Sequence, residues 1–266
     1  MKDSMPADPL PNADYRVRIY ERYASRFQSA PGVIDVNAAR RWGKAYHHYL
    51  RGWLPEHRDA RILDVACGGG KLLQFYLDAG YIDVHGVDLS PEQVALARQV
   101  TPNVVQANVL DYLAENPGRF DLISGLDIVE HFRKDEVLQF LDLCFAALKP
   151  GGRLVLQTPN ADSPWMTSVR YGDSTHELGF NPNALSRLLD LVGFEAIEAR
   201  EQGPVRWGYS VASTLRWCVW QCIRAGLKVW NVAETGDAGS GVFTRVFLMK
   251  AIKDVEYRDR RVAQEC

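Results

Sequence analysis

The chain has 266 residues, 47% of them hydrophobic, which is enough to bury a sizeable core as one enlarged domain or as a domain with appendages. Its formal charge of −2 gives no global electrostatic reason to bind nucleic acid, so no nucleic-acid partner is expected. The five cysteines form no CxxC pair and the N-terminal residues contain no apolar signal core, so the expected compartment is a reducing cytoplasm.

The first part of the chain reads as a leader followed by cap helices. Residues 1–13 are polar and contain prolines, and helical periodicity follows in 14–27 and 37–55. From residue 61 onward, short apolar runs alternate with helical stretches. The expected strands are 61–66, 82–89, 103–108, 120–125 and 153–158, and the expected helices begin at 71, 91 and 134. This alternation is typical of βαβ units and of a parallel sheet covered on both faces.

Two strand ends carry residues suited to a nucleoside cofactor. The first strand runs into DVACGGG at 64–70, where glycines let the backbone approach a ligand closely. The second ends in VDLS at 87–90, which places Asp88 where a carboxylate can accept hydrogen bonds from both hydroxyls of a ribose. A Gly-rich loop alone is a weak signal, but two matched strand ends are a stronger one. The glycine spacing differs from GxGxxG, which disfavours a dinucleotide and hydride transfer.

Five motifs follow one another in order along the chain: ILDVACGGGKLL (62–73), VHGVDLSPEQVALA (84–97), QANVLDYL (106–113), FDLISGLDIVEHF (120–132) and LKPGGRLVLQTPN (148–160). Through them, the chain between about residues 60 and 200 resembles class I S-adenosylmethionine (SAM)-dependent methyltransferases. The resemblance implies an α/β, Rossmann-like seven-stranded sheet with N-terminal cap helices, whose last strand enters antiparallel after a helical insertion. The final pair of strands is expected at 194–201 and 241–253.

The domain organisation is implied by the same resemblance. We expect a leader with cap helices over 1–58, a SAM-binding core over 59–201, a Trp-rich helical insertion over 202–241, and the last core strand with a polar tail over 242–266.

The resemblance also assigns SAM contacts residue by residue. Asp64 and Gly68 would line the methionine end, Asp88 would hold the ribose, and Asn108 would accept a hydrogen bond from the adenine amino group. The side chains expected to line the same site are Ala66, Leu89 and Val109. Ala66 stands where the family usually has its first glycine. Because alanine adds only a methyl group, we expect SAM binding to survive with a slightly shifted loop.

The segment GLDIVEHF at 125–132 raises a separate question, because it places Asp127, Glu130 and His131 within five positions after an apolar strand. One interpretation is a solvated helix start. The alternative is the reaction centre, since this segment comes after the fourth strand at the edge where the methyl group would be presented. Methyl transfer requires the acceptor to lose a proton, and a histidine suits a general base near neutral pH. His131 is the first candidate.

His176 comes after the fifth strand and is expected on the same side of the sheet as His131. A D/E-x-x-E-H pattern with a distant histidine resembles that of ubiquinone-biosynthesis O-methyltransferases and small-RNA 2′-O-methyltransferases, where it binds a divalent metal. The implied ligands are Asp127, Glu130, His131 and His176, with Mg²⁺ as an example of the metal. Two other interpretations stay open: His131 as a base without metal, with Glu130 and His176 beside it, and a structural role in which both histidines bind backbone partners.

The residues directly after the fourth strand constrain the acceptor. Methyltransferases of amino groups on DNA bases carry an Asn/Asp-Pro-Pro-aromatic turn there, and SGLDIVEH has none, so an oxygen acceptor is expected. The segment 171–180 and the insertion resemble bacterial surface-polysaccharide and sugar methyltransferases more than quinone enzymes. The first expectation is therefore a hydroxyl of a sugar, polysaccharide or glycolipid precursor. The alternatives are a small phenol or quinone precursor, and a non-catalytic SAM-binding partner module.

The insertion is rich in tryptophan and basic side chains: Trp207, Trp217, Trp220 and Trp230, with Arg216, Arg224 and Lys228. Its charges interrupt it too often for a membrane span, but it suits an interfacial helix on a membrane or a lid over a saccharide. The plainer alternative is a helical hairpin or a homodimer contact packed on the domain. Cys218 and Cys222 lie one helical turn apart and are expected in the core rather than at a metal.

Overall fold

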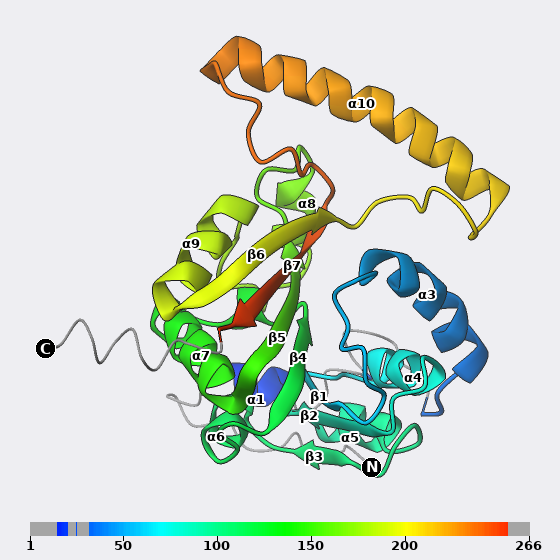
Figure 1. Ribbon diagram of the computed structural model, residues 1–266, viewed down its shortest axis with the longest axis vertical. Coiled ribbons are helices and arrows are strands. Elements are labelled where there is room, and N and C mark those ends of the chain that lie inside the picture. Colours follow the sequence, from blue (N-terminus) through cyan, green and yellow to red (C-terminus); the bar gives the residue numbers. More distant parts are fainter. Residues whose placement is uncertain (1–14, 21–24, 26–31, 255–266) are drawn as a thin grey trace, which may run out of the picture.

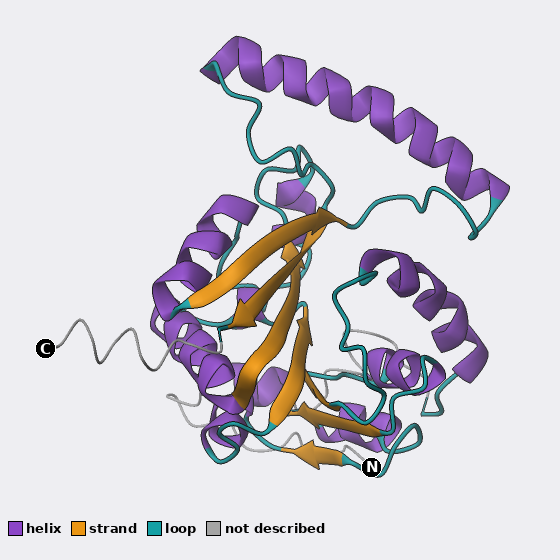
Figure 2. Ribbon diagram, viewed as in Figure 1, coloured by secondary structure: helices purple, strands orange, loops and turns teal. Residues whose placement is uncertain are grey.

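The computed structural model describes residues 15–20, 25 and 32–254, and these form a seven-stranded sheet with helices on both faces (Figures 1 and 2). The strand order is β3-β2-β1-β4-β5-β7-β6. The strands are β1 (Arg61–Val65), β2 (Asp83–Asp88), β3 (Val104–Gln106), β4 (Phe120–Leu126), β5 (Leu148–Pro159), β6 (Phe194–Glu201) and β7 (Val246–Lys253). All neighbours pair in parallel except β7, which is antiparallel to both β5 and β6. The expected fold class is confirmed.

The helices divide between the two faces according to the core that they bury. The helices are α1 (Tyr15–Tyr20), α3 (Val36–Tyr49), α4 (Lys71–Asp78), α5 (Pro91–Ala97), α6 (Val109–Ala114), the 3₁₀ turn η1 (Val129–His131), α7 (Lys134–Ala147), α8 (Met166–Arg170), α9 (Pro182–Val192) and α10 (Val211–Thr235). One hydrophobic core joins α3, α4 and α5 to the sheet, and the other joins α6, α7 and α9 to the opposite face. Four of the five residues of β1 are buried, as a central parallel strand requires.

The strand order reverses between β1 and β4, because the chain builds β1 to β3 outward on one side and then returns to the other. Ligands of open α/β sheets bind in the crevice at such a reversal, outside the carboxyl ends of the strands. The loops after β1, β2, β3 and β4 therefore meet at the edge where the sequence places its candidate residues.

The insertion differs from a packed hairpin. It forms the single 25-residue helix α10, which begins at the Ser210 cap and ends at Gly236 with a positive φ of 77°. Figure 1 shows α10 standing apart from the sheet, joined to it by two loops. Cys218 and Cys222 are exposed, so the expectation that they belong to the core is wrong. Among the described residues, no helix combines the length and hydrophobicity needed to cross a bilayer.

Most of the two ends of the chain lies outside the described residues. The leader at 1–13 and most of the polar tail lie outside the described residues, as do parts of the helix expected over 14–27. The second cap helix is confirmed as α3, whose Asp35 cap accepts a hydrogen bond from the backbone N–H of Ala38.

Candidate active site

A cavity of about 1260 Å³ opens at the carboxyl ends of β1 to β4 and is covered by α1 and α3. Every residue predicted to contact SAM lines this cavity: Asp64, Ala66, Gly68, Asp88, Leu89, Asn108 and Val109. The residues predicted at the reaction centre line the same cavity: Asp127, Glu130, His131 and His176. The topology thus brings together residues from loops that lie far apart in the sequence. The individual contacts to SAM remain predictions.

Asp64 ends the first strand in a buried position. Its Oδ1 accepts a hydrogen bond from Ser124 Oγ at 2.7 Å, and β1 and β4 are direct neighbours there. Burial raises the pKa of Asp64 to about 7, with the Ser124 hydrogen bond opposing the rise and the charge of Asp88 adding to it. A buried carboxyl group of this kind is stabilised in its ionised form when a cation such as the ammonium or sulfonium of SAM enters the cavity.

The loop after β1 contains a non-glycine residue in left-handed backbone. Ala66 has φ of 53°, a conformation that costs an L-residue about 1–2 kcal/mol and glycine very little. This explains physically why the family usually has glycine here. Gly70 has φ of 83°, and a Cβ at this position would lie 3.1 Å from the Cα of Ala97. The third glycine therefore lets α4 start close against α5.

Asp88 ties the first two loops together before any ligand binds. Its Oδ2 accepts a hydrogen bond from the backbone N–H of Gly68 and its Oδ1 accepts one from the backbone N–H of Ser90, each at 2.8 Å. Burial raises the pKa of Asp88, while the backbone donors oppose the rise. Each carboxylate oxygen keeps a second lone pair, so the geometry leaves it able to accept from ribose hydroxyls.

Asn108 caps a helix, in addition to its predicted role as an acceptor for the adenine amino group. It caps α6, accepting a hydrogen bond at Oδ1 from the backbone N–H of Leu110 at 2.9 Å. Its side chain is exposed at the cavity rim, where its Nδ2 can donate and its Oδ1 has a second lone pair. Leu89, 42% exposed beside the same rim, offers an apolar surface for an aromatic base.

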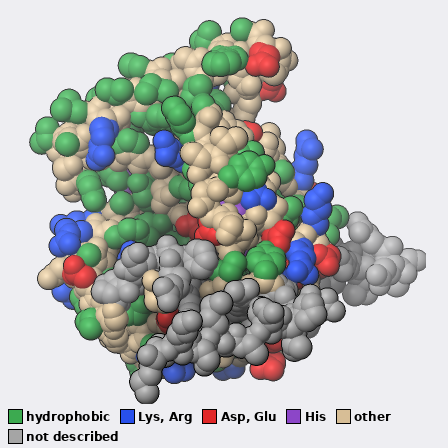
Figure 3. Space-filling model, turned by 180° about the vertical axis from the view of Figure 1, so that it is seen from behind, with side chains coloured by type: hydrophobic (Ala, Val, Ile, Leu, Met, Phe, Trp, Pro, Cys, Tyr) green, Lys and Arg blue, Asp and Glu red, His purple; other side chains and the backbone are tan. Residues whose placement is uncertain are grey.

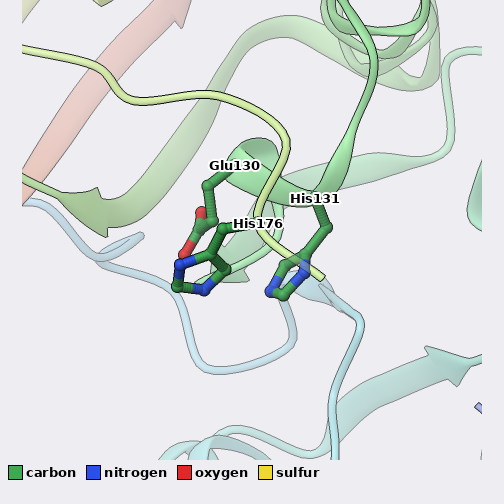
Figure 4. A group of neighbouring side chains, drawn as sticks. All are labelled: Glu130, His131 and His176. Carbon is green, nitrogen blue, oxygen red and sulfur yellow. The ribbon is translucent and has the colours of Figure 1, made fainter. Parts of the chain in front are cut away.

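His131 and His176 converge, as the sequence predicts. Their ring centroids lie 4.8 Å apart, and Figure 4 shows both rings beside Glu130. His176 Nδ1 lies 3.1 Å from the carbonyl oxygen of Arg170, which can only accept, so Nδ1 carries the proton. His131 Nδ1 lies 2.9 Å from Thr175 Oγ1, whose own hydrogen is donated to Asp173. In the neutral form of each ring, these contacts put the proton on Nδ1 and the lone pair on Nε2.

Burial, followed by the proximity of His176, lowers the pKa of His131 to about 4. At neutral pH the His131 ring is therefore uncharged and has an available lone pair. The same shift makes it a weaker base than an ordinary histidine.

Glu130 is completely buried at the first turn after β4. Its Oε2 accepts a hydrogen bond from Thr158 Oγ1 at 2.9 Å, whereas its Oε1 has no hydrogen-bond partner. Burial and the charge of Asp127 raise the pKa of Glu130 well above its ordinary value. Its backbone carbonyl accepts from the N–H groups of Glu177 and Leu178, which fixes the His176 loop against η1. A buried oxygen without a partner at a cavity wall indicates a position where a ligand group belongs.

The predicted metal shell is reduced from four residues to three. Glu130, His131 and His176 each present one ligand atom, and these atoms lie within 4.8 Å of one another. Asp127 is not part of this cluster. Its backbone has φ of 54°, and its carboxylate accepts two hydrogen bonds from Gln157 Nε2, at 2.9 and 3.1 Å. The prediction of Asp127 as a ligand used only its spacing from Glu130 and His131. That spacing does not show that Gln157 on β5 is a hydrogen-bond partner for Asp127.

Other cavity residues escaped the sequence analysis. Gln157 Oε1 accepts hydrogen bonds from Tyr46 Oη at 2.7 Å and from Gln202 Nε2 at 2.8 Å, forming a partly buried network that ends on Asp127. Burial raises the pKa of Tyr46, with the charge of Asp127 adding to the rise. Because these residues come from α3, β5 and the end of β6, only the tertiary fold could reveal the network.

The N-terminal helix α1 closes the same cavity from the other side. Arg16 forms two hydrogen bonds with the carboxylate of Glu136 on α7, each at 2.8 Å. Tyr20 lines the cavity, and burial raises its pKa to about 12. No residue of α1 was predicted at the site, although Arg16 and Tyr20 both line the cavity.

Comparison with known proteins decides the family. The model of the methyltransferase domain family matches residues 35–199, which is more than half of the chain. The chain belongs to this family. This methyltransferase also has the fold of solved SAM-dependent enzymes, including one from Archaeoglobus fulgidus with 19% identity and a TM-score of 0.59, covering 90% of this chain and 100% of that one.

A second solved structure is phosphoethanolamine N-methyltransferase 2 from Haemonchus contortus in complex with S-adenosyl-L-methionine. Its TM-score is 0.58 at 17% identity, covering 88% of the methyltransferase described here and 60% of that chain. At such identities the similarity shows the fold alone.

Two curated relatives are more similar over shorter stretches. The ubiquinone biosynthesis O-methyltransferase of Xanthomonas campestris is 38% identical over 107 residues, which is 38% of this chain and 44% of that protein. The protein of the same name from Xylella fastidiosa is 39% identical over 109 residues, 38% of this chain and 42% of that protein. The methyltransferase thus matches less than half the length of these relatives.

Proposed function

We propose that this SAM-dependent methyltransferase transfers its methyl group to a hydroxyl of a small phenol or quinone precursor. The observation that carries the proposal is the cluster of Glu130, His131 and His176, whose ligand atoms lie within 4.8 Å of one another in the cavity that also contains the loops after β1 and β2. The O-methyl assignment is supported by the name of the partial relatives from Xanthomonas and Xylella.

The reaction is an in-line displacement at the methyl carbon. The acceptor oxygen forms the new C–O bond while the S–C bond breaks, S-adenosylhomocysteine leaves, and the hydroxyl proton passes to the protein. The candidate proton acceptors are the side chains of His131, His176 and Glu130, whose ligand atoms lie within 4.8 Å of one another. His131, with its pKa near 4, is a weak base. A weak base favours an acidic acceptor, and a phenol ionises near pH 10, well below an aliphatic alcohol.

The acceptors rank in a different order from the one expected from the sequence. The sugar hydroxyl was placed first because of a loose resemblance in 171–180 and in the insertion. The insertion contributes no residue of α10 to the described wall of the cavity, so it does not act as a lid over a saccharide there. A phenol or quinone precursor is therefore the first choice and a sugar hydroxyl the second. The buried, unpartnered Glu130 Oε1 favours catalysis over a non-catalytic binding module.

A second candidate role for the same three side chains is to hold a divalent metal. Two imidazole nitrogens and one carboxylate oxygen fit the requirement for donors, and Glu130 Oε1 has no protein partner to displace. This donor set suits Zn²⁺, Fe²⁺ or Mn²⁺ better than Mg²⁺, which prefers oxygen ligands. A bound metal would supply a Lewis acid that lowers the pKa of the acceptor hydroxyl. The role of the chain would be to hold that ion through Glu130, His131 and His176.

The test is a transfer assay with methyl-labelled SAM, offered either a dihydroxylated benzoate or a nucleotide sugar. We expect label on the phenol. With a metal-free base, His131→Ala should lose about a hundredfold or more in rate and a chelator should have no effect. With a metal, His131→Ala and His176→Ala should both abolish turnover, and the chelator should reproduce the loss in the unmodified protein. The exposed His57 provides the control variant His57→Ala.

Two outcomes would contradict the proposal. Label found only on the sugar would restore the saccharide assignment. Full activity in both His131→Ala and His176→Ala would return this pair to a structural role, because neither imidazole would then touch the reacting atoms.

A further inference from the structure

Helix α10 turns its polar residues toward the protein. Ser213 Oγ donates a hydrogen bond to the carbonyl oxygen of Val205 at 2.8 Å. Further along the helix, Trp220 Nε1 donates to Glu201 Oε2 at 3.1 Å and Arg224 Nε donates to the carbonyl oxygen of Gly241, also at 3.1 Å. Positions with these spacings share one side of a helix, so this side of α10 faces the domain.

The opposite side of α10 is apolar and exposed, and we call it the outer face. Its larger members include Val211 at 80% exposure, Val229 at 70% and Leu215 at 62%. The complete outer face is Val211, Ala212, Leu215, Cys218, Val219, Cys222, Ile223, Ala225, Gly226, Val229, Trp230, Val232 and Ala233, all exposed. None of these residues carries a charge. Figure 3 shows hydrophobic side chains gathered along this helix at the top of the molecule.

The width of the outer face indicates the kind of surface that covers it. At about 100° per residue its members occupy roughly half of the helix circumference. A two-helix coiled coil buries only the narrower stripe of a and d positions, so pairing with a second helix would leave much of this face in water. A flat apolar medium covers a half-circumference completely, and a helix of 25 residues offers it a length of about 37 Å.

The charges at the edges of the outer face indicate which apolar surface it contacts. Arg216 and Lys228 are exposed beside it, and α10 contains three basic residues, Arg224 included, against the single acid Glu234. An apolar half with cations along its margins matches a helix lying in the headgroup region of a bilayer that contains anionic lipid. The exposed ring of Trp230, whose N–H donates to Glu234 Oε2 at 3.0 Å, adds an aromatic side chain suited to that region.

We propose that α10 is an interfacial helix that docks this protein on an anionic lipid bilayer, with the outer face buried at the boundary between headgroups and acyl chains. The helix is inserted between Gln202 and Val246, which both line the cavity. Docking therefore places the bilayer beside the end of the sheet that contains the cavity. An acceptor held in the membrane would reach the site from there; that consequence rests on the proposed function, whereas the docking does not.

Vesicle flotation with the full-length protein tests the docking without acceptor or turnover. We expect binding to phosphatidylcholine vesicles that contain phosphatidylglycerol, and weaker binding to phosphatidylcholine alone. Leu215→Glu and Val229→Glu should each weaken binding about tenfold or more, because each places a charge in the buried face. Arg216→Ala should weaken binding to the anionic vesicles about fivefold. The matched control is Leu191→Glu on α9, at 67% exposure, which should bind like the unmodified protein.

Folding of each variant is checked by its thermal melt and its affinity for S-adenosylhomocysteine, which the outer face should not influence. The proposal is overturned if the unmodified protein stays unbound on anionic vesicles, or if Leu215→Glu floats as the unmodified protein does. It is also overturned if the protein sediments as a dimer that Leu215→Glu dissociates while vesicles bind neither form. The outer face would then be a contact between two copies of the chain.

Discussion

The carboxylate of Asp88 offers the most direct test of the cofactor site. In the structure it accepts backbone hydrogen bonds from Gly68 and Ser90, and its remaining lone pairs are available to two ribose hydroxyls. Asp88→Ala removes a charged acceptor, for which hydrogen bonds are worth about 1.5–3 kcal/mol. The dissociation constant for S-adenosylhomocysteine should therefore rise about 10- to 150-fold. Asp88→Asn keeps the shape and one acceptor oxygen, and should have an intermediate effect.

Isothermal titration calorimetry with S-adenosylhomocysteine measures this change, and a thermal melt separates lost affinity from lost folding. Asp142→Ala is the control, because Asp142 is an exposed acid on α7 outside the cavity wall. Unchanged affinity in Asp88→Ala would refute the assignment of the ribose to the end of β2. An equal loss in Asp142→Ala would show that net charge, rather than the Asp88 contact, controls binding.

Three further predictions concern stability. Ala66→Gly relieves the left-handed backbone and should raise the free energy of unfolding by about 0.5–1 kcal/mol in urea denaturation, after the entropy of glycine is subtracted; a loss would show that the φ of 53° is not strained. The pKa of Asp64 rises from 3.8 to about 7 on folding, so the folded state holds a proton that the unfolded chain releases, and this carboxyl lowers stability progressively as pH rises from about 4 to about 7. Asp64→Asn should therefore raise the melting temperature of the ligand-free protein more at about pH 8 than at about pH 5, and an equal change at both would contradict the shift. Gln157→Leu removes the acceptor of the buried Tyr46 hydroxyl and both hydrogen bonds to the Asp127 carboxylate, and should cost about 1–3 kcal/mol of unfolding free energy; unchanged stability would show that water replaces the network.

The sequence predicted the sheet well because a buried parallel strand has a strong local signature. The strand expected at 61–66 is observed at Arg61–Val65, and the one expected at 194–201 is observed at Phe194–Glu201. Short elements were harder to predict. The helix α6 has six residues and only one of them is fully buried, so its apolar periodicity is too brief to detect.

Within the site, sequence reasoning succeeded where topology alone brings residues together. His131 and His176 come after neighbouring parallel strands, so their convergence could be expected. Sequence reasoning failed where a side chain finds its partner on a distant element. Asp127 binds Gln157 and is not part of the cluster of Glu130, His131 and His176. Gly86 illustrates the same limit. A Cβ there would lie 2.8 Å from Cys67 Sγ, a close approach that shows only when β1 and β2 are side by side.

The insertion was predicted to be helical and rich in tryptophan, but the direction of its faces could not be read from the sequence. Cys218 and Cys222 were expected to face the core because cysteine is usually buried. The structure turns them outward, since Trp220 and Arg224 bind the domain from the other side of α10. The apolar residues of a helix show in the sequence which side avoids water. They do not show whether that side packs on the domain or on another surface.

We expect SAM to lie across the loops after β1 and β2 with its methyl group directed at His131 and His176. The decisive measurement is a crystal structure with S-adenosylhomocysteine and a phenolic acceptor. It should show ribose hydroxyls on Asp88, the sulfur atom facing the two imidazoles, and the acceptor hydroxyl between that sulfur and the imidazole rings. Density that places the sulfur away from both rings, or the acceptor outside the cavity, would contradict this expectation.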